Sequence, residues 1–393
     1  MCKVDVIIIG AGASGLFCAI EAARRGRQVV VLDHAASPGR KILASGGGRC
    51  NFSNYEVAPG HFLSANPHFC KSALSRYNQW NFLDLVKEYK IRFVEREHGQ
   101  LFCEQSASEI LAMLLDLCEK SGVRICTRQT ITDVKRSGEG EFVVTANQIS
   151  YVSASLVIAS GGLAMGDLCA SDLGYTLAKK FGHTIIPTRP GLVPLTFSAR
   201  DKEILAPLSG IALPATVTCR KESFTENLLF THRGLSGPVI LQISNYWQAG
   251  DPITIDLLPG CDLLDVLKAA QKAHPQRQLK TVLHERLPKR LVLALLSDEL
   301  ISRPLQSLSY ADFADVQRHL QQWLLRPAGN EGYKSAEVTI GGIDTNEVSS
   351  KTMESRKVAG LYFVGEVLDV TGWLGGYNLQ WAWSSGWCAG QYV

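Results

Sequence analysis

The chain has 393 residues, of which 46% are hydrophobic and 20% charged, and its formal net charge is +3. This composition supplies material for more than one buried core and excludes a disordered chain. Basic residues are scattered, with short clusters such as Lys289-Arg290, so no nucleic-acid partner is expected. The chain begins with a strand and lacks an apolar run of bilayer length, so a cytoplasmic protein without membrane association is expected.

The eleven cysteines are odd in number and form no C-x-x-C pair. Neither a disulfide framework nor a zinc site fits such spacing, so we expect no metal. This use of cysteine also agrees with a reducing compartment.

The first 33 residues predict a strand, a glycine-rich turn, a helix and a second strand. In such a turn the first glycine permits the bend, the second lets backbone N–H groups approach phosphate, and the third lets the helix pack closely. A carboxylate at the end of the second strand can accept hydrogen bonds from ribose hydroxyls, and its negative charge would repel a 2′-phosphate. The candidate residues for this dinucleotide site are Gly10, Gly12, Ala13, Ser14, Gly15 and Asp33.

The segment that follows combines three successive glycines with basic, thiol and amide side chains. Backbone without side chains can lie against a flat ring or a phosphate, and the basic groups supply positive charge. A flexible loop is the alternative, and for Cys50 a packing or flavin-lining role is favoured over a redox thiol. The candidates here are Arg40, Lys41, Ser45, Gly46, Gly47, Gly48, Arg49, Cys50 and Asn51.

Further along, residues 68–120 predict helices with short strands between them at residues 93–95 and 100–102. Residues 155–160 predict a buried strand that ends in Gly161-Gly162. This glycine pair again suits close contact with a cofactor. From about residue 187, prolines separate short apolar stretches, which indicates a β-rich insertion. Helical periodicity returns over residues 263–326.

Near the C-terminus a buried strand delivers an acid at its carboxyl end, where ligands of open α/β sheets bind. A glycine pair and a final helix follow, and Asn378 is expected to cap that helix. Two ligand-type elements so far apart in the chain favour FAD, a cofactor long enough to reach both. Its ribitol is expected near the acid and its isoalloxazine against the glycine pair. The candidates are Gly365, Glu366, Gly375, Gly376, Tyr377, Asn378 and Leu379.

His232 is the candidate for acid–base chemistry because histidine side chains titrate near neutral pH. It lies in residues 230–238, within the insertion. The competing interpretation is a structural histidine that fixes the loop between domains.

Three motifs together, residues 45–51, residues 230–238, and residues 365–369 with 375–378, make the whole chain similar to the BaiN/RdsA family of bacterial flavoproteins. Members are described as aminoacetone oxidases and as a reductase of dehydro-bile acids. The resemblance implies noncovalently bound FAD, with backbone at Ile131 meeting the adenine. It also implies an α/β fold in which a two-dinucleotide-binding-type (Rossmann-like) FAD domain is interrupted by an inserted β-barrel and a helical subdomain.

The expected domains are residues 1–188 plus 356–393 for FAD, residues 189–258 plus 331–355 for the β-rich insertion, and residues 259–330 for the helical subdomain. The expected function is an FAD-dependent oxidoreductase that transfers hydride between flavin N5 and a small amine, carbonyl or enone, with NAD(P)H as a candidate transient reductant. One alternative is a sensor or interaction protein with structural FAD, and another is an NAD dehydrogenase without flavin. The oligomeric state is not defined by the sequence.

Overall fold

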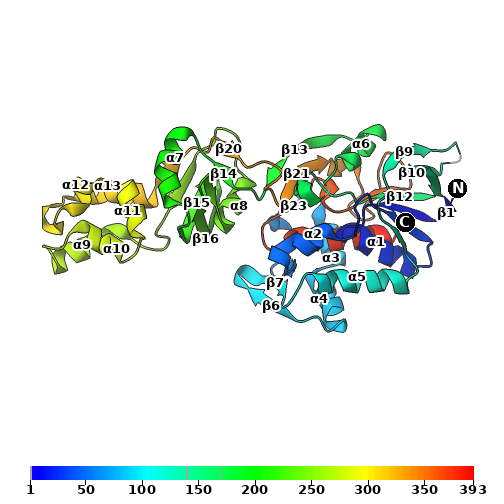
Figure 1. Cartoon of the computed structure of the whole chain (residues 1–393), viewed down its shortest axis with the longest axis horizontal. Helices are drawn as coiled ribbons and strands as arrows, with labels where there is room; N and C mark the ends of the chain where they lie inside the picture. The colour runs from blue at the N-terminus through cyan, green and yellow to red at the C-terminus, as the bar shows by residue number, and fades with distance from the viewer. Residues whose placement is uncertain (1, 139, 169) are drawn as a thin grey trace. The chain divides into compact units, whose positions relative to one another are not determined.

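The computed structural model describes residues 2–138, 140–168 and 170–393, and the chain forms two compact units (Figure 1). Unit 1 comprises Met1–Pro190 and Glu337–Val393, and unit 2 comprises Gly191–Ala336. The chain therefore returns to unit 1 earlier than expected. The sequence pattern places residues 337–355 in the insertion, but β21 (Val338–Ile343) pairs with β13 (Ile185–Gly191), a pairing between distant segments that local patterns do not reveal.

A five-stranded parallel sheet forms the centre of unit 1, in the order β22-β12-β2-β3-β8. The strands β2 and β3 consist of Val, Ile and Leu and are buried throughout, as strands covered on both faces must be. In Figure 1 the blue helix α1 and the red helix α14 lie side by side. This core consists of β2 (Val6–Ile9), α1 (Ala13–Arg24), β3 (Val29–Leu32), α5 (Ser108–Lys120), β8 (Arg124–Cys126), β12 (Ser155–Ile158), β22 (Leu361–Phe363) and α14 (Tyr377–Gly390).

Smaller sheets and short helices accompany this core. Elements β2, α1 and β3 confirm the predicted strand–turn–helix–strand beginning, and the predicted helices within residues 68–120 are also present. The smaller sheets have the orders β1-β11-β10-β9, β4-β7-β6 and β23-β5. Their members and the remaining helices are β1 (Cys2–Lys3), α2 (Arg40–Ala44), β4 (Asn51–Asn54), β5 (Phe62–Leu63), α3 (Cys70–Arg76), α4 (Gln79–Glu88), β6 (Phe93–Arg96), β7 (Gln100–Cys103), β9 (Ile131–Arg136), β10 (Phe142–Ala146), β11 (Ile149–Ser153), α6 (Leu173–Lys180) and β23 (Thr371–Gly372).

Unit 2 contains one antiparallel sheet of seven strands in the order β19-β18-β15-β16-β17-β14-β20. Its helices share one hydrophobic core with this sheet, so residues 259–330 are not a separate compact unit. The elements are β14 (Leu195–Thr196), α7 (Ala199–Leu205), β15 (Ala212–Cys219), β16 (Glu222–Phe230), β17 (Gly234–Ser236), α8 (Pro238–Ser244), β18 (Ile253–Asp256), α9 (Leu263–Ala273), α10 (Leu279–His284), α11 (Lys289–Leu295), α12 (Asp298–Ser302), α13 (Tyr310–Gln321), β19 (Trp323–Leu325) and β20 (Gly329–Asn330).

The ten cysteines within the described residues are all free thiols, and Cys169 lies outside those residues. Over the described part of the chain, no helix is both long enough and apolar enough to cross a bilayer.

Helix α14 is held in unit 1 by aromatic packing at Trp383. This side chain is fully buried, its ring stacks on Phe82 with 4.4 Å between centroids, and its Nε1 donates to the Phe52 carbonyl at 2.9 Å. Trp383→Ala is expected to lower the free energy of unfolding by about 3–5 kcal/mol, because it leaves a cavity and an unpaired carbonyl. Urea denaturation followed by far-UV circular dichroism measures this loss.

Trp80→Ala is the control, because Trp80 is 50% exposed and its ring stacks on Tyr55 near the surface. Its expected cost is about 1 kcal/mol or less. Equal losses for the two variants would contradict the assigned role of Trp383.

Candidate functional site

The predicted dinucleotide turn forms as expected at the end of β2. A Cβ on Gly10 would lie 2.3 Å from the Ala159 carbonyl oxygen, and φ at Gly10 is +112°, so only glycine fits this turn. The Asp33 carboxylate accepts from the Ala11 N–H at 2.6 Å and from the Ala35 N–H at 2.8 Å. Asp33 thus ties the turn to the end of β3, and its contact with ribose stays a prediction.

Space for a ligand is open at Gly12, the N-cap of α1. A Cβ there would meet no atom within 4 Å, and no side chain caps the helix. The N-terminus of a helix favours anions, so the position fits a pyrophosphate. Ser14, on the first turn of α1, lies against the C-terminal segment, since a Cβ on Gly365 would be 2.5 Å from Ser14 Oγ.

The structure brings Lys41, Gly161, Gly162, Thr339 and Glu366 together, and we call these residues the Glu366 cluster. Lys41 Nζ lies 3.0 Å from Glu366 Oε2, and Glu366 Oε1 accepts from the Thr339 N–H at 2.9 Å. A Cβ on Gly162 would lie within 2.8 Å of both Thr339 and Glu366, and one on Gly161 would touch Glu366 at 3.7 Å. Sequence patterns placed four of these residues at the site but missed Thr339.

Thr339 has no recognisable motif around it, and its role is visible only in the fold. Its Oγ1 accepts from the N–H groups of Leu163 and Ala164 at 2.7 and 3.0 Å, and its carbonyl accepts from Thr371 Oγ1 at 3.2 Å. It therefore joins the glycine pair at 161–162 to the strand that leads to α14.

The glycine run at 45–48 is a short turn in which Gly46, Gly47 and Gly48 have φ between +59° and +84°. A Cβ on Gly47 or Gly48 would meet nothing within 4 Å. Arg49 is exposed beside this open backbone. The run therefore offers room and positive charge without a side-chain wall.

The flanking candidates of this run have structural contacts of their own. Ser45 Oγ donates to the Ile42 carbonyl at 2.7 Å, and an Arg40 nitrogen lies 3.3 Å from the Asp167 carbonyl. Cys50 is fully buried, and burial raises the pKa of its thiol to about 12. A group that holds its proton in this way is no nucleophile, which agrees with the packing role expected for Cys50.

The N-terminus of α14 meets β4 at Gly376, whose φ is +93°. A Cβ on Gly376 would lie 2.2 Å from the Ser53 carbonyl oxygen and 2.8 Å from the Asn51 side chain. Gly375 lies likewise against Gln100, and the amide of Gln100 is 3.1 Å from that of Asn51. Asn51 and the C-terminal glycine pair, far apart in sequence, are therefore neighbours.

The expectation that Asn378 caps α14 is wrong. The N-cap is Gly376, and no side chain caps it. Asn378 is the second residue of the helix, where its amide pairs with backbone of Gly372 at 2.8 and 3.0 Å and with the Trp373 carbonyl at 3.2 Å. Asn378 thus fixes the loop before the helix, and Leu379 packs half-buried on the core of unit 1.

His61 belongs to this region and was missed in the sequence, where it is a lone histidine without a motif. Its ring lies 4.6 Å from that of Trp373 and 4.9 Å from that of Tyr377. Its Nδ1 is buried and has no hydrogen-bond partner within the described residues, and burial lowers the pKa of the imidazole. His61 is therefore a ring with an unpaired nitrogen beside the N-terminus of α14.

Two further candidates lie elsewhere. His232 is exposed on the loop between β16 and β17 of unit 2, and no hydrogen bond to its ring occurs within the described residues. Ile131 begins β9, next to Thr130, whose N–H and carbonyl both pair with Asn147. The roles predicted for His232 and Ile131 stay predictions.

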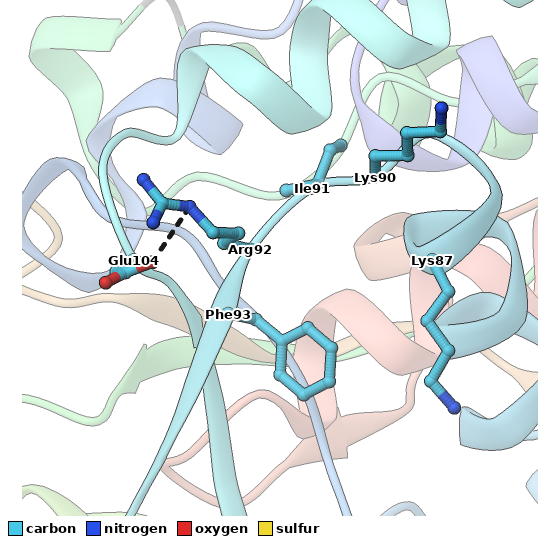
Figure 2. A pocket seen from close by; sticks show the side chains of 6 residues that line it. All are labelled: Lys87, Lys90, Ile91, Arg92, Phe93 and Glu104. Atoms are coloured by element: carbon cyan, nitrogen blue, oxygen red, sulfur yellow. Dashed lines mark ion pairs between the residues drawn. The ribbon is translucent and has the colours of Figure 1, made fainter.

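A separate hollow of about 420 Å³ lies on the surface of unit 1 and is shown in Figure 2. Its polar lining is mixed in charge, since Arg92 pairs with Glu104 at 3.2 Å. Its six lining residues are Lys87, Lys90, Ile91, Arg92, Phe93 and Glu104, and none was predicted for the site.

The parallel sheet, the open turn at Gly12 and the glycine contacts at both ends of the chain define a Rossmann-type FAD-binding fold. A solved 3-ketosteroid-delta4-(5alpha)-dehydrogenase from Rhodococcus jostii RHA1 shares the fold, with a TM-score of 0.50 and 14% identity over 99% of this chain and 97% of that one. The model of the HI0933-like protein Rossmann domain matches residues 4–392, so the chain belongs to this family.

Two relatives cover nearly the whole chain. The chain is 52% identical to the "Ribosomal RNA dihydrouridine synthase" of Escherichia coli (strain K12), over 99% of this chain and 98% of the relative. It is 33% identical to the "3-dehydro-bile acid delta(4,6)-reductase" of Clostridium scindens, over 98% of this chain and 97% of the relative. These relatives confirm the resemblance to BaiN/RdsA flavoproteins.

Because Gly12 faces open space, its substitution separates cofactor binding from folding. Gly12→Val is expected to give a folded protein that has lost most of its flavin, since the side chain fills the place of the pyrophosphate. The absorbance of bound flavin after purification measures the loss, and circular dichroism reports the fold. Gly138→Val is the control at an exposed position that is equally open, and it should keep its flavin. A folded Gly12→Val protein with full flavin content would refute the assignment.

Proposed function

We propose that this protein is an FAD-dependent reductase that saturates a carbon–carbon double bond conjugated to a carbonyl, and that its substrate is a uridine of ribosomal RNA. The observation that carries the proposal is the meeting of Gly12, the Glu366 cluster and the N-terminus of α14 within unit 1. The name of the relative with 52% identity supports the choice of substrate. The proposal departs from the sequence-based expectation of a small substrate and no nucleic acid, which is untested.

The residues of unit 1 fit FAD along the carboxyl edge of the sheet. Gly12 and the start of α1 suit the pyrophosphate, and the Glu366 cluster offers a carboxylate and an ammonium group for ribitol hydroxyls. The N-terminus of α14 favours negative charge on the pyrimidine end of the ring. When bound, FAD would supply hydride transfer at N5.

In such a reduction, a side chain of the protein would donate the proton. A double bond conjugated to a carbonyl gains hydride at one carbon and a proton at its neighbour, and a histidine can supply that proton. We propose His232 for this role, because its ring is exposed and free of hydrogen bonds in the described structure. His61, beside Trp373 and Tyr377, is the second candidate.

NAD(P)H is the proposed reductant, meeting the flavin transiently. Among the described residues, the parallel strand–helix–strand arrangement that binds dinucleotides occurs in unit 1, whereas the sheet of unit 2 is antiparallel. The described residues of unit 2 therefore offer no second dinucleotide-binding fold that would hold a resident nicotinamide. The proposed place of action is a reducing cytoplasm, which the free thiols favour.

A small enone is the second candidate substrate, supported by the name of the relative with 33% identity. Both names describe the addition of hydrogen to a double bond conjugated with a carbonyl. The two substrates therefore call for the same chemistry and differ in size and charge.

The decisive experiment incubates the FAD-loaded protein and NADPH with ribosomal RNA transcribed in vitro, and measures dihydrouridine by mass spectrometry of nucleosides. We expect dihydrouridine with the native protein and none with Gly12→Val. A 3-oxo-4,6-diene steroid acid in a parallel reaction tests the small enone. Reduction of the steroid alone would overturn the RNA substrate. A flavin that neither NADH nor NADPH bleaches under anaerobic conditions would favour the sensor interpretation.

Substitution of the proton donor should slow turnover without loss of flavin. His232→Ala is expected to reduce the rate of substrate-dependent flavin oxidation about 100-fold. Anaerobic stopped-flow absorbance with prereduced protein measures this rate. An unchanged rate in His232→Ala together with a slow rate in His61→Ala would transfer the role to His61.

A further inference from the structure

One segment of unit 2, residues 268–290, carries a large excess of positive charge. It holds seven Lys and Arg residues and a single acid, Glu285. Its formal charge of +6 exceeds the +3 of the whole chain, so the remaining residues are acidic as a group. A modest net charge thus hides one strongly basic segment, whose exposed side chains we call the 268–290 patch.

The cations of the patch are presented to solvent. Lys268, Lys272, Arg286, Lys289 and Arg290 are exposed, and Arg277 and Lys280 are half-buried. Lys268 lies 3.6 Å from Asp265, and Arg277 pairs with Glu285. In the described structure the other five cations lie beyond ion-pair distance of any carboxylate, so most of the charge is not neutralised by the protein. These five are Lys272, Lys280, Arg286, Lys289 and Arg290.

The three helices of the patch are held together by one connecting stretch. Gln271 Nε2 of α9 donates to the carbonyls of Leu305 and Leu308 at 2.7 and 2.9 Å. The N–H of Leu279, at the start of α10, donates to the Arg303 carbonyl at 3.1 Å. Helix α11 packs in turn on α10, so the three helices that carry these cations form one packed part of unit 2.

An exposed aromatic ring beside the patch favours a nucleic acid over a simple anion. Tyr310 is 64% exposed, and Lys268 Nζ lies 5.4 Å from the centre of its ring, so an exposed aromatic ring lies beside one cation of the patch.

We propose that the 268–290 patch binds the phosphodiester backbone of RNA and holds a large RNA substrate on unit 2. This inference rests on the proposed function, because it supplies the affinity that a reductase of ribosomal RNA needs. Several lysines and arginines without a carboxylate partner, spread over residues 268–290, match a chain of phosphates, and an exposed tyrosine matches an unstacked base. Such contacts depend on charge and carry no sequence specificity.

The test compares two variants of the full-length, FAD-loaded protein that lose the same charge. The patch variant is Lys272→Gln, Lys280→Gln and Lys289→Gln, with one substitution in or at the start of each patch helix. The control variant is Lys71→Gln, Lys87→Gln and Lys90→Gln, three exposed lysines of unit 1, two of which border the hollow in Figure 2. The probe is ribosomal RNA transcribed in vitro, and its dissociation constant is measured over a series of salt concentrations.

For the native protein, the logarithm of affinity should fall linearly with the logarithm of salt concentration. The slope should be shallower by about 2–3 in the patch variant and nearly unchanged in the control variant, because each lysine of the patch neutralises about one phosphate. Equal slopes in the two variants would overturn the proposal. Vesicles of phosphatidylglycerol serve as the competing anionic surface, and a loss of vesicle binding with RNA binding intact would also overturn it.

Binding and catalysis fail separately in this design. RNA binding through the patch without formation of dihydrouridine would sustain the patch and overturn the proposed reaction. If the patch variant forms dihydrouridine and binds RNA with native affinity, the result would sustain the proposed reaction and overturn the patch. Circular dichroism and flavin content must match the native protein in both variants, and a patch variant that misfolds is replaced by its three single substitutions.

Discussion

The close approach of helix α1 to the parallel sheet is the contact on which the rest of unit 1 depends. Gly10 lies against the Ala159 carbonyl, and a Cβ on Gly15 would lie 2.0 Å from the Gly10 carbonyl oxygen. Helix α14 then lies on α1 just as closely, since a Cβ on Gly386 would be 2.5 Å from the Ser14 carbonyl oxygen. Backbone-to-backbone packing of this kind fixes the start of α1 and the C-terminal helix relative to one edge of the sheet.

Polar contacts then set the chemistry along that edge. Lys41, Thr339 and Glu366 come from three distant parts of the chain and satisfy one another, so the carboxylate of Glu366 is held in place by an ion pair and a backbone N–H. Thr371 links Thr339 to the loop that Asn378 fixes before α14. A cofactor that spans from Gly12 to Gly376 would therefore lie along groups whose positions are mutually dependent.

The two units divide the properties that the proposed reaction requires. Unit 1 provides the dinucleotide fold, the Glu366 cluster and His61 with its unpaired nitrogen. Unit 2 provides His232 and the 268–290 patch, where unneutralised charge is concentrated. The net charge of the whole chain does not reveal the basic segment, because the rest of the chain is acidic as a group and cancels about half of its charge.

The sequence by itself determined the dinucleotide turn, the buried parallel strands, the β-rich insertion and most residues of the Glu366 cluster. These features are local, because glycine spacing, strand periodicity and an acid at a strand end follow from the conformations that neighbouring residues allow. The tertiary structure alone decided that residues 337–355 return to unit 1, that Thr339 joins the cluster, that Asn378 binds a loop instead of capping its helix, and that His61 lies beside Trp373. Each of these depends on a contact between residues that the local pattern does not pair, and such contacts are set by how the sheets and helices pack.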